Sequence, residues 1–395
     1  MCGIAGAIGT LTGEVREAVR KANAAQRLRG PDADGFWESH ADDGPRGTVF
    51  AHRRLAIIDL SEGGRQPMID RVTGNVITFN GEVFNYVELR RELEASGVEF
   101  VSKSDTEVIL KAFGKWGAGC VARLRGMFAF AIHEARTGRV LLARDRLGEK
   151  PLYYTTVPSK TGRGATFYFA SEVRALLAGG VTSRRLSPLA LATYHWHGFV
   201  ADDQSILEGV RRLPAASFAW VEPDGRIGPI EAYWQLPGDH DRTTDPSALA
   251  HELERSVSMR LVSDVPLGVF LSGGVDSSAI AALASHSSER PIQTFNVCFD
   301  EAEFDESPWA RRVAQAIGAD HHEIHLTQQS FRDRLDDALG SLDQPTFDGL
   351  NTYIVSRAVR DAGMTVALSG AGGDELFGGY RSFRELSKLR LASRL

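Results

Sequence analysis

The sequence predicts two fused domains: a layered α+β domain, followed by an α/β domain with a parallel sheet. Up to about residue 180 it is rich in short β runs, interrupted by two amphipathic helical patterns. Strands and helices that occur in such clusters are typical of layered α+β domains. From about Ala248 the order becomes helix, apolar strand, glycine-rich turn and helix, as in parallel α/β sheets. With 395 residues, 43% of them hydrophobic, the chain is long enough for two or three globular domains.

The first domain is expected to alternate strands with two helices. Apolar residues spaced three to four apart predict helices over 83–95 and 106–116, which end near Gly97 and Gly117. Runs rich in β-branched and aromatic residues predict strands over 47–59, 75–79, 127–133, 140–144, 152–156 and 166–170.

Turn signals separate the two halves. Pro223-Asp224-Gly225 is one such signal in the stretch from about 183 to 245, which we expect to hold some strand of its own. We therefore predict a first domain over 1–212, a connecting region over 213–245 and a second domain over 246–395. In the second domain, apolar strands over 265–271 and 365–368 each lead into a glycine-rich turn, and a helix over 277–284 follows the first turn.

Composition excludes several classes of partner. The chain has 45 Lys and Arg against 51 Asp and Glu, a net charge of -6 and no basic block, which argues against a nucleic-acid partner. No apolar run approaches the ~20 residues of a membrane span, and no signal peptide is indicated. We therefore expect a cytoplasmic protein. The three cysteines have no paired spacing, so neither a disulfide framework nor a zinc ribbon is predicted, and Cys120 and Cys298 are expected to be inert core thiols.

Cys2 is the most informative residue of the first domain, because only Met1 precedes it. Removal of Met1 would leave a thiol and a free α-amine on one residue. An α-amine with a pKa near ~8 can act as the base for that thiol at neutral pH. Cys2 is therefore a candidate nucleophile that carries its own base. The alternative is a small apolar residue at the start of a strand.

The strongest motif of the second half is Phe-Leu-Ser-Gly-Gly-Val-Asp-Ser-Ser at residues 270–278. An apolar strand runs into a Ser/Gly turn and then a helix, so backbone N–H groups and the positive helix end face the turn. An anion such as pyrophosphate fits there. The glycines match neither a Walker A loop nor a dinucleotide fingerprint. The structural alternative is a glycine-rich turn in which Ser and Asp act as helix caps.

A second acidic turn, Ser-Gly-Ala-Gly-Gly-Asp-Glu-Leu-Phe-Gly-Gly-Tyr, follows at residues 369–380. Carboxylates at the carboxyl end of a parallel strand suit Mg²⁺, which prefers oxygen ligands and bridges protein carboxylates to phosphates. The alternative is a helix N-terminus at which Asp374 and Glu375 complement the dipole. Two such turns in one sheet favour a nucleotide crevice.

Taken together, these residues resemble the glutamine-dependent asparagine synthetases. The resemblance rests on the initial Met-Cys-Gly-Ile, Arg-Gly-Pro-Asp at 29–32, His-Arg-Arg-Leu at 52–55, Asn-Gly-Glu at 80–82, Ser-Asp at 104–105 and the two turns, and so runs nearly end to end. It implies an N-terminal-nucleophile glutaminase domain with an αββα sandwich. This domain would be fused to a parallel-sheet ATP-pyrophosphatase domain of the adenine nucleotide α-hydrolase type.

For the first domain, the resemblance implies glutamine hydrolysis at Cys2 through a thioester, which releases ammonia and then glutamate. Asn80 and Gly81 would stabilise the oxyanion. Arg54 would bind the substrate α-carboxylate, and Asp105 the α-ammonium. The implied glutamine-binding set also contains Ile57, Ile58 and Glu82.

Each of these residues also has a structural interpretation. Asn80-Gly81 is a common tight-turn pair. Asp105 lies in Ser-Asp-Thr-Glu, which is a helix capping-box pattern. The alternative for Arg54 is an ordinary surface arginine without a binding role.

For the second domain, the resemblance implies transfer of AMP from ATP to an acceptor carboxylate, most simply aspartate, followed by attack of ammonia to form asparagine. ATP would be a substrate and Mg²⁺ a cofactor, with Asp276 and Asp374 near the metal. The resemblance also implies an internal ammonia channel and allows a homodimer. The implied nucleotide and pyrophosphate residues are Leu271, Ser272, Gly273, Gly274, Asp276, Ser277, Val297, Ser369 and Gly370.

The sequence departs from the family pattern at three places. Ala371 stands where many relatives have an acidic residue, and an alanine side chain cannot act as a base or bind an amine. Leu28 replaces the histidine of the familiar Arg-His-Arg-Gly-Pro-Asp, for which we expect a modest effect. The sequence ends at Leu395, whereas relatives continue through a further helical region, so we expect the second domain to be incomplete.

The sequence therefore leaves a leading hypothesis and three alternatives. The leading one is a ligase that makes asparagine. Two others are amidation of a different carboxylate in a specialised pathway, and a glutaminase whose second half is inactive. A non-catalytic module that keeps the fold is disfavoured by the retention of Cys2, Arg54, Asn80 and Asp105.

Overall fold

The chain forms two compact units, residues 1–240 with 342–349, and residues 241–341 with 350–395. A computed structural model describes residues 1–39, 46–158, 164–201, 203–238, 245–301, 303, 305–383 and 385–386. None of the helices within these residues is both long enough and apolar enough to cross a membrane.

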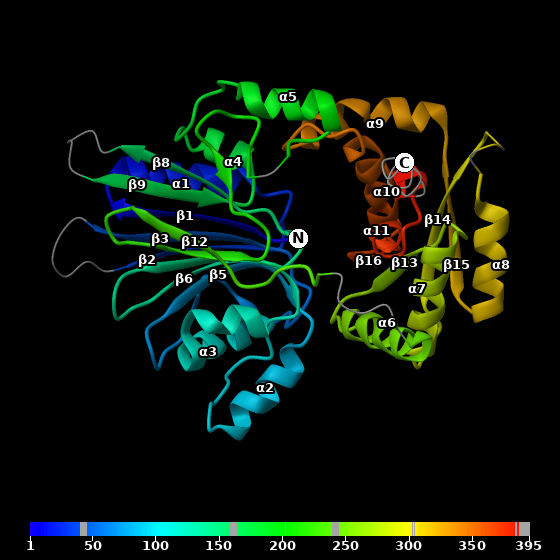
Figure 1. The fold of residues 1–395 in the computed structure, drawn as a ribbon, viewed down its shortest axis with the longest axis horizontal. Coiled ribbons are helices and arrows are strands. Elements are labelled where there is room, and N and C mark those ends of the chain that lie inside the picture. The colour runs from blue at the N-terminus through cyan, green and yellow to red at the C-terminus, as the bar shows by residue number, and fades with distance from the viewer. Residues whose placement is uncertain are drawn as a thin grey trace, which may run out of the picture. The chain divides into compact units, whose positions relative to one another are not determined.

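The first unit contains two six-stranded sheets, whose strands pair antiparallel (Figure 1). The first sheet has the order β10-β8-β9-β1-β3-β2 and the second the order β12-β11-β7-β6-β5-β4. The first sheet comprises β1 (Gly3–Thr10), β2 (Ala33–Glu38), β3 (Arg46–Arg54), β8 (Tyr153–Pro158), β9 (Ala165–Ala170) and β10 (Arg211–Arg212). The second comprises β4 (Met68–Ile69), β5 (Val76–Val83), β6 (Gly126–His133), β7 (Val140–Arg144), β11 (Ser217–Val221) and β12 (Ile227–Ala232).

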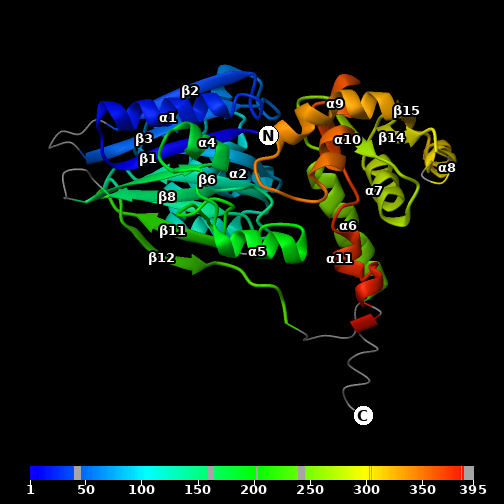
Figure 2. The ribbon, with the colours of Figure 1, turned by 90° about the horizontal axis from the view of Figure 1, so that it is seen from above.

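Helices cover the outer faces of both sheets. Strand β1 shows how the layers arise, because successive side chains point to opposite faces. Its Ile4 and Ile8 enter the core between the sheets, whereas its Ala5 and Ala7 pack under the helices of the first sheet. These helices are α1 (Gly13–Ala25) and α4 (Val173–Ala178), and Figure 2 shows α1 alongside β1, β2 and β3. The second sheet is covered by α2 (Tyr86–Ala95) and α3 (Asp105–Trp116).

Residues 342–349 belong to the first unit, although they are distant in sequence from the rest of it. The Asp343 carboxylate accepts hydrogen bonds of 2.8 Å from the backbone N–H groups of Val173 and Arg174, at the start of α4. The Gln344 side chain accepts a bond of 2.9 Å from the N–H of Ile206. A carboxylate at a helix N-terminus satisfies otherwise unpaired N–H groups, which explains how this segment is held.

The second unit is built on the parallel sheet β15-β14-β13-β16, formed by β13 (Leu267–Phe270), β14 (Gln293–Phe299), β15 (Asp320–Leu326) and β16 (Val366–Leu368). Its core joins β13 to three helices, α6 (Pro246–Arg260), α7 (Val275–His286) and α8 (Ser307–Ile317). Figure 2 shows α6 and α7 side by side. The remaining helices are α9 (Gln328–Ser341), α10 (Gly349–Asp361) and α11 (Gly373–Phe377).

The predicted fold class, an αββα sandwich followed by a parallel α/β sheet, is confirmed. Individual elements differ in their bounds. The strand predicted over 75–79 continues to Val83, because Asn80-Gly81 lies within β5. The expected connecting region contains β11 and β12, which pair with each other, and β11 also pairs with β7. A helix that the sequence analysis did not predict, α5 (Pro188–His197), begins at the Ser187 cap and ends at the left-handed Gly198.

Candidate functional site

A pocket in the first unit brings together the predicted glutamine-site residues. It lies where β1, β3 and β5 approach the start of α3. Cys2 immediately precedes β1, Arg54 ends β3, and Asp105 begins α3. The lining contains all the predicted residues, Cys2, Arg54, Ile57, Ile58, Asn80, Gly81, Glu82 and Asp105, together with Met1, Leu55, Gly64, Gln66, Phe79, Ser104, Thr106, Met127 and Lys150.

The Cys2 thiol is held against the backbone of Leu55. Its Sγ lies 3.6 Å from the Leu55 carbonyl oxygen and 3.4 Å from the Leu55 nitrogen, whose N–H points at the sulfur. The Arg29 Nε donates a hydrogen bond of 2.8 Å to the Cys2 carbonyl. Burial raises the pKa of the Cys2 thiol, and the nearby N-terminus opposes that rise. The thiol is therefore protonated on its own and requires a base to react.

The α-amine at the start of the chain is in a suitable state to be that base. Burial lowers the pKa of the Met1 α-amine to about 5, and the charges of Arg29 and Lys150 contribute. The Met1 α-amine is thus mostly neutral at pH 7. Met1 itself lines the pocket, and the Lys150 Nζ donates to its sulfur at 3.2 Å.

Asn80 offers an unused hydrogen-bonding group to the pocket. It is fully buried, yet neither Oδ1 nor Nδ2 of its side chain has a partner among the described residues. An unsatisfied buried amide costs about 1–3 kcal/mol, so such a group points to a ligand. Asn80 and Gly81 form strand rather than the turn that was the structural alternative.

Gly81 is required by its neighbours. A Cβ at this position would lie 2.1 Å from the Met127 carbonyl oxygen, and the backbone φ is 155°. Only glycine fits that approach between β5 and β6 without displacing the strand pair. Glycine thus keeps strands β5 and β6 paired, and residue 81 lines the pocket beside Asn80.

Arg54 is an inward-facing side chain that is only 8% exposed, unlike an ordinary surface arginine. Its guanidinium donates to the carbonyl oxygens of Asp59 and Ser61, the latter at 3.1 Å. Gly64 permits this position, since a Cβ there would lie 2.1 Å from the Arg54 Nη2. These two bonds use two of five N–H donors and orient the planar group, which is suited to bidentate binding of a carboxylate.

Asp105 is a buried carboxyl, and burial raises its pKa to about 6. Its Oδ2 accepts a hydrogen bond of 3.0 Å from the N–H of Val83. The cap of α3 is Ser104, whose hydroxyl accepts from the Thr106 N–H at 3.2 Å. Glu107 accepts from the N–H groups of Val101 and Ser102, at 2.7–3.1 Å. Asp105 therefore serves neither as the cap nor as its reciprocal partner.

Sequence reasoning missed three residues that shape this pocket. Asp59 supports the arginine loop, because its carboxylate accepts from the N–H groups of Ser61 and Lys103. Gln66 lines the pocket and accepts from the Phe79 N–H at 2.6 Å. Lys150 follows a turn in which the Asp145 carboxylate accepts several backbone N–H bonds, including that of Lys150. The sequence signal that could have indicated Lys150 is an aspartate, Asp145, ahead of a Gly-containing turn.

In the second unit, the first glycine-rich turn joins β13 to α7. Gly273 has a φ of 84°, and a Cβ there would lie 2.6 Å from Trp309 Cβ, so this tight approach requires glycine. The hydroxyls of Ser272 and Ser277 lie 2.9 Å apart, and the Gly274 N–H donates to Ser272 Oγ at 3.2 Å. The turn is thus closed by its own serines beside the N-terminus of α7.

The second glycine-rich turn, between β16 and α11, packs directly against the first. A Cβ at Gly370 would lie 2.9 Å from the Ser277 nitrogen, and one at Gly373 would lie 2.4 Å from the Asp276 carboxylate. The two turns share a pocket of about 730 Å³, lined by Phe270, Ser272, Gly274, Val275, Asp276, Ser277, Gly370, Ala371, Asp374 and Gly379. That volume lies within the range of ligand pockets.

Asp276 and Asp374 therefore lie at one pocket, as the magnesium prediction requires. Two carboxylates beside the backbone of a Ser/Gly turn provide the oxygen donors that Mg²⁺ prefers. Glu375 is directed elsewhere, since its carboxylate accepts from the Tyr380 hydroxyl at 2.8 Å. The residues present thus fit a magnesium ion held by Asp276 and Asp374.

The other predicted nucleotide residues are distributed around this pocket. Leu271 is buried beneath the turn, and Val297 lies on β14. Ser369 lines an adjoining, largely apolar pocket between α6, α7 and α11, together with Gly370 and Ala371. The structure brings Ser272, Gly274, Asp276, Ser277, Gly370 and Asp374 together, whereas Leu271, Gly273, Val297 and Ser369 are outside that lining.

Comparison with known proteins finds a different family in each half of the chain. Residues 1–234 match the glutamine amidotransferase domain, and residues 248–394 match asparagine synthase. The chain is 35% identical to the putative asparagine synthetase (glutamine-hydrolysing) 2 of Methanocaldococcus jannaschii, over 96% of this chain and 76% of that protein. It is 33% identical to asparagine synthetase (glutamine-hydrolysing) 3 of Bacillus subtilis, over 97% of this chain and 64% of that protein.

The match extends to proteins with other names. Amidase chry2 of Gibberella zeae is 30% identical, over 97% of this chain and 60% of that protein. This chain therefore spans between 60% and 76% of the length of these three relatives.

Proposed function

The chain belongs to the family of glutamine-hydrolysing asparagine synthetases, and from this premise we propose that it is a glutamine-dependent ligase which forms an amide from a carboxylate, ATP and glutamine-derived ammonia. The observation that carries the proposal is the pocket that gathers Cys2, the unpartnered Asn80 amide, Arg54 and Asp105. Four groups with complementary chemistry at one pocket are difficult to explain by packing alone.

Glutamine hydrolysis begins once Met1 is removed, which both vacates part of the pocket and frees the Cys2 amine. The amine accepts the thiol proton as Sγ attacks the glutamine side-chain amide. The same proton then goes to the leaving nitrogen, so that ammonia departs and a thioester remains. Water hydrolyses the thioester to glutamate and regenerates the thiol. The low pKa of the N-terminal amine, about 5 in the chain with Met1, supports a neutral base at pH 7.

Both steps pass through a tetrahedral oxyanion. The fully buried Asn80 Nδ2 and the Gly81 N–H supply a pair of donors to that oxygen. Such donors require no reorganisation, because the strand pair β5–β6 already holds them.

Arg54 and Asp105 recognise the amino-acid end of glutamine. The guanidinium binds the α-carboxylate, and the Asp105 carboxylate binds the α-ammonium. Ile57, Ile58 and Glu82 form the walls around the substrate chain.

The second unit activates the acceptor. ATP binds at the two glycine-rich turns, with its phosphates at Ser272, Gly274 and Ser277. Asp276 and Asp374 would hold Mg²⁺, which when bound would neutralise phosphate charge. The acceptor carboxylate takes AMP and releases pyrophosphate, and ammonia displaces AMP to give the amide.

Aspartate is the acceptor we propose first, which makes asparagine the product. The exposed Ala371 beside both pockets favours a second candidate, a different carboxylate, because alanine offers no group to bind an α-ammonium. The similarity to amidase chry2 is compatible with such an acceptor. A cytoplasmic location and a homodimer are also part of this proposal.

A single mass-spectrometric assay tests the proposal. Purified protein, verified to lack Met1, is incubated with glutamine, Mg-ATP and aspartate, and glutamate, AMP and asparagine are counted together. Equal yields of all three support an aspartate-using ligase. Glutamate and AMP without asparagine favour another acceptor, which a panel of carboxylic acids would identify.

Two further outcomes are decisive. Glutamate alone, abolished by Cys2→Ala but kept in the matched control Cys120→Ala, would reduce the activity to a glutaminase. Cys120 is a buried thiol that does not line the pocket, so it controls for loss of a cysteine as such. No glutamate from protein that lacks Met1 would overturn the role of Cys2.

A further inference from the structure

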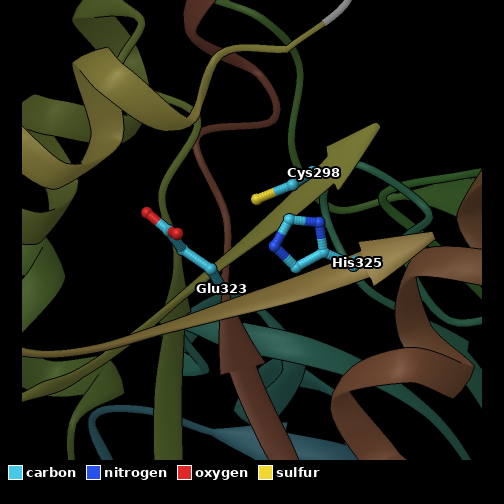
Figure 3. A group of neighbouring side chains, drawn as sticks. All are labelled: Cys298, Glu323 and His325. Atoms are coloured by element: carbon cyan, nitrogen blue, oxygen red, sulfur yellow. The ribbon is translucent and has the colours of Figure 1, made fainter. Parts of the chain in front are cut away.

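Three side chains at the edge of the parallel sheet converge without a role in the proposed reaction. Strands β14 and β15 pair in parallel register, with Cys298 opposite His325 and Asn296 opposite Glu323. Because side chains alternate along a strand, Cys298, Glu323 and His325 point to the same face. Figure 3 shows them directed toward one another from the two neighbouring strands.

The chemistry of this trio is that of a transition-metal site. One thiol sulfur, one imidazole nitrogen and one carboxylate oxygen lie within 4.8 Å of one another. Sulfur, nitrogen and oxygen donors of these kinds are the usual ligands of Zn²⁺. In a tetrahedral zinc site, donor atoms are roughly 3.3–3.8 Å apart, given metal–ligand bonds of about 2.0–2.3 Å. The donor atoms would therefore need to approach one another by about 1 Å. Rotation of the exposed His325 side chain can provide this movement.

The buried thiol is the part of the cluster that the sequence analysis left without a purpose. Cys298 is 1% exposed, and its Sγ donates to the Asn296 Oδ1 at 3.1 Å. A thiol binds a divalent cation as the thiolate, so the bound cation would replace the thiol proton.

Glu323 is already held by a neighbour, in a way that fits a metal ligand. The Arg311 Nε and Nη2 each donate to the Glu323 carboxylate at 2.9 Å. The plain interpretation is an ion pair beside a buried thiol. However, carboxylates that bind metals are themselves hydrogen-bonded by outer-shell groups, which fix their orientation. Each carboxylate oxygen has a second lone pair, so Arg311 can hold Glu323 while one oxygen binds the cation.

We propose that Cys298, Glu323 and His325 bind one Zn²⁺ ion, with water as the fourth ligand. The exposure of His325 gives solvent access to the fourth position. The ion joins the edge strand β15 to β14, one residue beyond Val297. This site is separate from Asp276 and Asp374 in composition, since it offers sulfur and nitrogen where they offer oxygen alone.

Cobalt titration of the full chain provides the test, because a thiolate-bound Co²⁺ absorbs strongly in the near ultraviolet. The titration uses the Cys2→Ala protein, so that the N-terminal thiol does not contribute. We expect a sulfur-to-metal band that saturates at one cobalt per chain and is removed by one equivalent of Zn²⁺.

Variants locate the ion. Cys298→Ser should remove the sulfur band, and His325→Gln should weaken binding by at least the roughly 10- to 100-fold that loss of an outer-shell partner costs. The exposed position of His325 makes unfolding of that variant unexpected, and circular dichroism checks it. His322→Gln is the matched control, since the adjacent His322 ring stacks on Phe295 at 5.0 Å between ring centroids and faces the other side of the strand.

The outcomes separate clearly. Loss of the band in Cys298→Ser and weaker binding in His325→Gln, with normal binding in His322→Gln, support the site. No sulfur band in the parent, or an unchanged band in Cys298→Ser, would overturn it. Equal weakening in His325→Gln and His322→Gln would also count against it, because it would indicate nonspecific binding by surface histidines.

Discussion

The pocket around Cys2 and the pocket between the two glycine-rich turns differ in how completely the protein builds them without a ligand. Asn80, Asp105 and Arg54 are 0%, 5% and 8% exposed. Asn80 lies within β5, the Val83 N–H donates to Asp105, and backbone carbonyls accept from Arg54. By contrast, Asp276 and Asp374 are only partly buried, and Ala371 is exposed. Charges interact more strongly where water is excluded. We infer that the first pocket acts through preformed groups, whereas the second depends on the phosphates and the metal ion to order it.

The largest expected effect tests whether the two pockets have separable activities. Cys2→Ala removes the nucleophile, so glutamate formation should fall by about 10³-fold or more. AMP formation with ammonium chloride in place of glutamine should persist, since the turns of the second unit are untouched. Both products are measured by mass spectrometry. Loss of ammonia-driven AMP formation in a folded Cys2→Ala protein would contradict the separation.

Asn80→Ala sharpens the contrast by separating activity from stability. If the amide stabilises the oxyanion, kcat for glutamine should fall about 10²- to 10³-fold. Because the buried amide has no partner among the described residues, its removal should leave the melting temperature unchanged or raised. Kinetics and calorimetry on one preparation provide the test. A large drop in melting temperature with an equal loss of activity would make Asn80 a structural residue.

Asp374→Asn makes the reciprocal test in the second unit. Replacing a carboxylate that holds the metal should cost about 1.5–3 kcal/mol of transition-state stabilisation. The rate of AMP formation should therefore fall roughly 10- to 150-fold. Raised Mg²⁺ should recover part of the loss, whereas glutamate formation should be unaffected. Glu375→Gln is the control, because Glu375 accepts from Tyr380 and does not line the pocket. Equal effects of the two changes would remove Asp374 from the metal site.

The same contrast explains what the sequence could predict. Cys2 was found from its place directly after Met1, whereas Arg54, Asn80 and Asp105 were found because their motifs resemble a family pattern. Asp59 was missed, since it acts through the backbone of the arginine loop and has no local pattern. Residues 342–349 were placed in the second domain. Their place in the first unit depends on the long-range capping of α4 by Asp343, which no local pattern indicates.

The smallest expected effect concerns the pH dependence of the first pocket. Burial raises the pKa of Asp105 to about 6 in the folded protein, above the usual value of 3.8. Its carboxylate must be ionised to bind the glutamine α-ammonium, so KM for glutamine should rise about tenfold as pH falls from 7 to 5. Asp105→Asn should have a high KM that no longer varies over this range. Titration of the N-terminal amine would instead lower kcat, which distinguishes the two groups.

The same shift has the opposite consequence for stability. Between about pH 4 and pH 6 the folded protein keeps a proton on Asp105 that the unfolded chain has released, so stability falls as pH rises through that window. Asp105→Asn removes this cost and should raise the melting temperature at pH 8, with a benefit that shrinks toward pH 4. If this variant binds glutamine poorly yet is more stable, the buried Asp105 carboxylate destabilises the folded protein but is needed to bind the substrate. If Asp105→Asn and the parent protein have equal melting temperatures at pH 8 and at pH 4, Val83 and the rest of the pocket already stabilise the ionised Asp105 carboxylate.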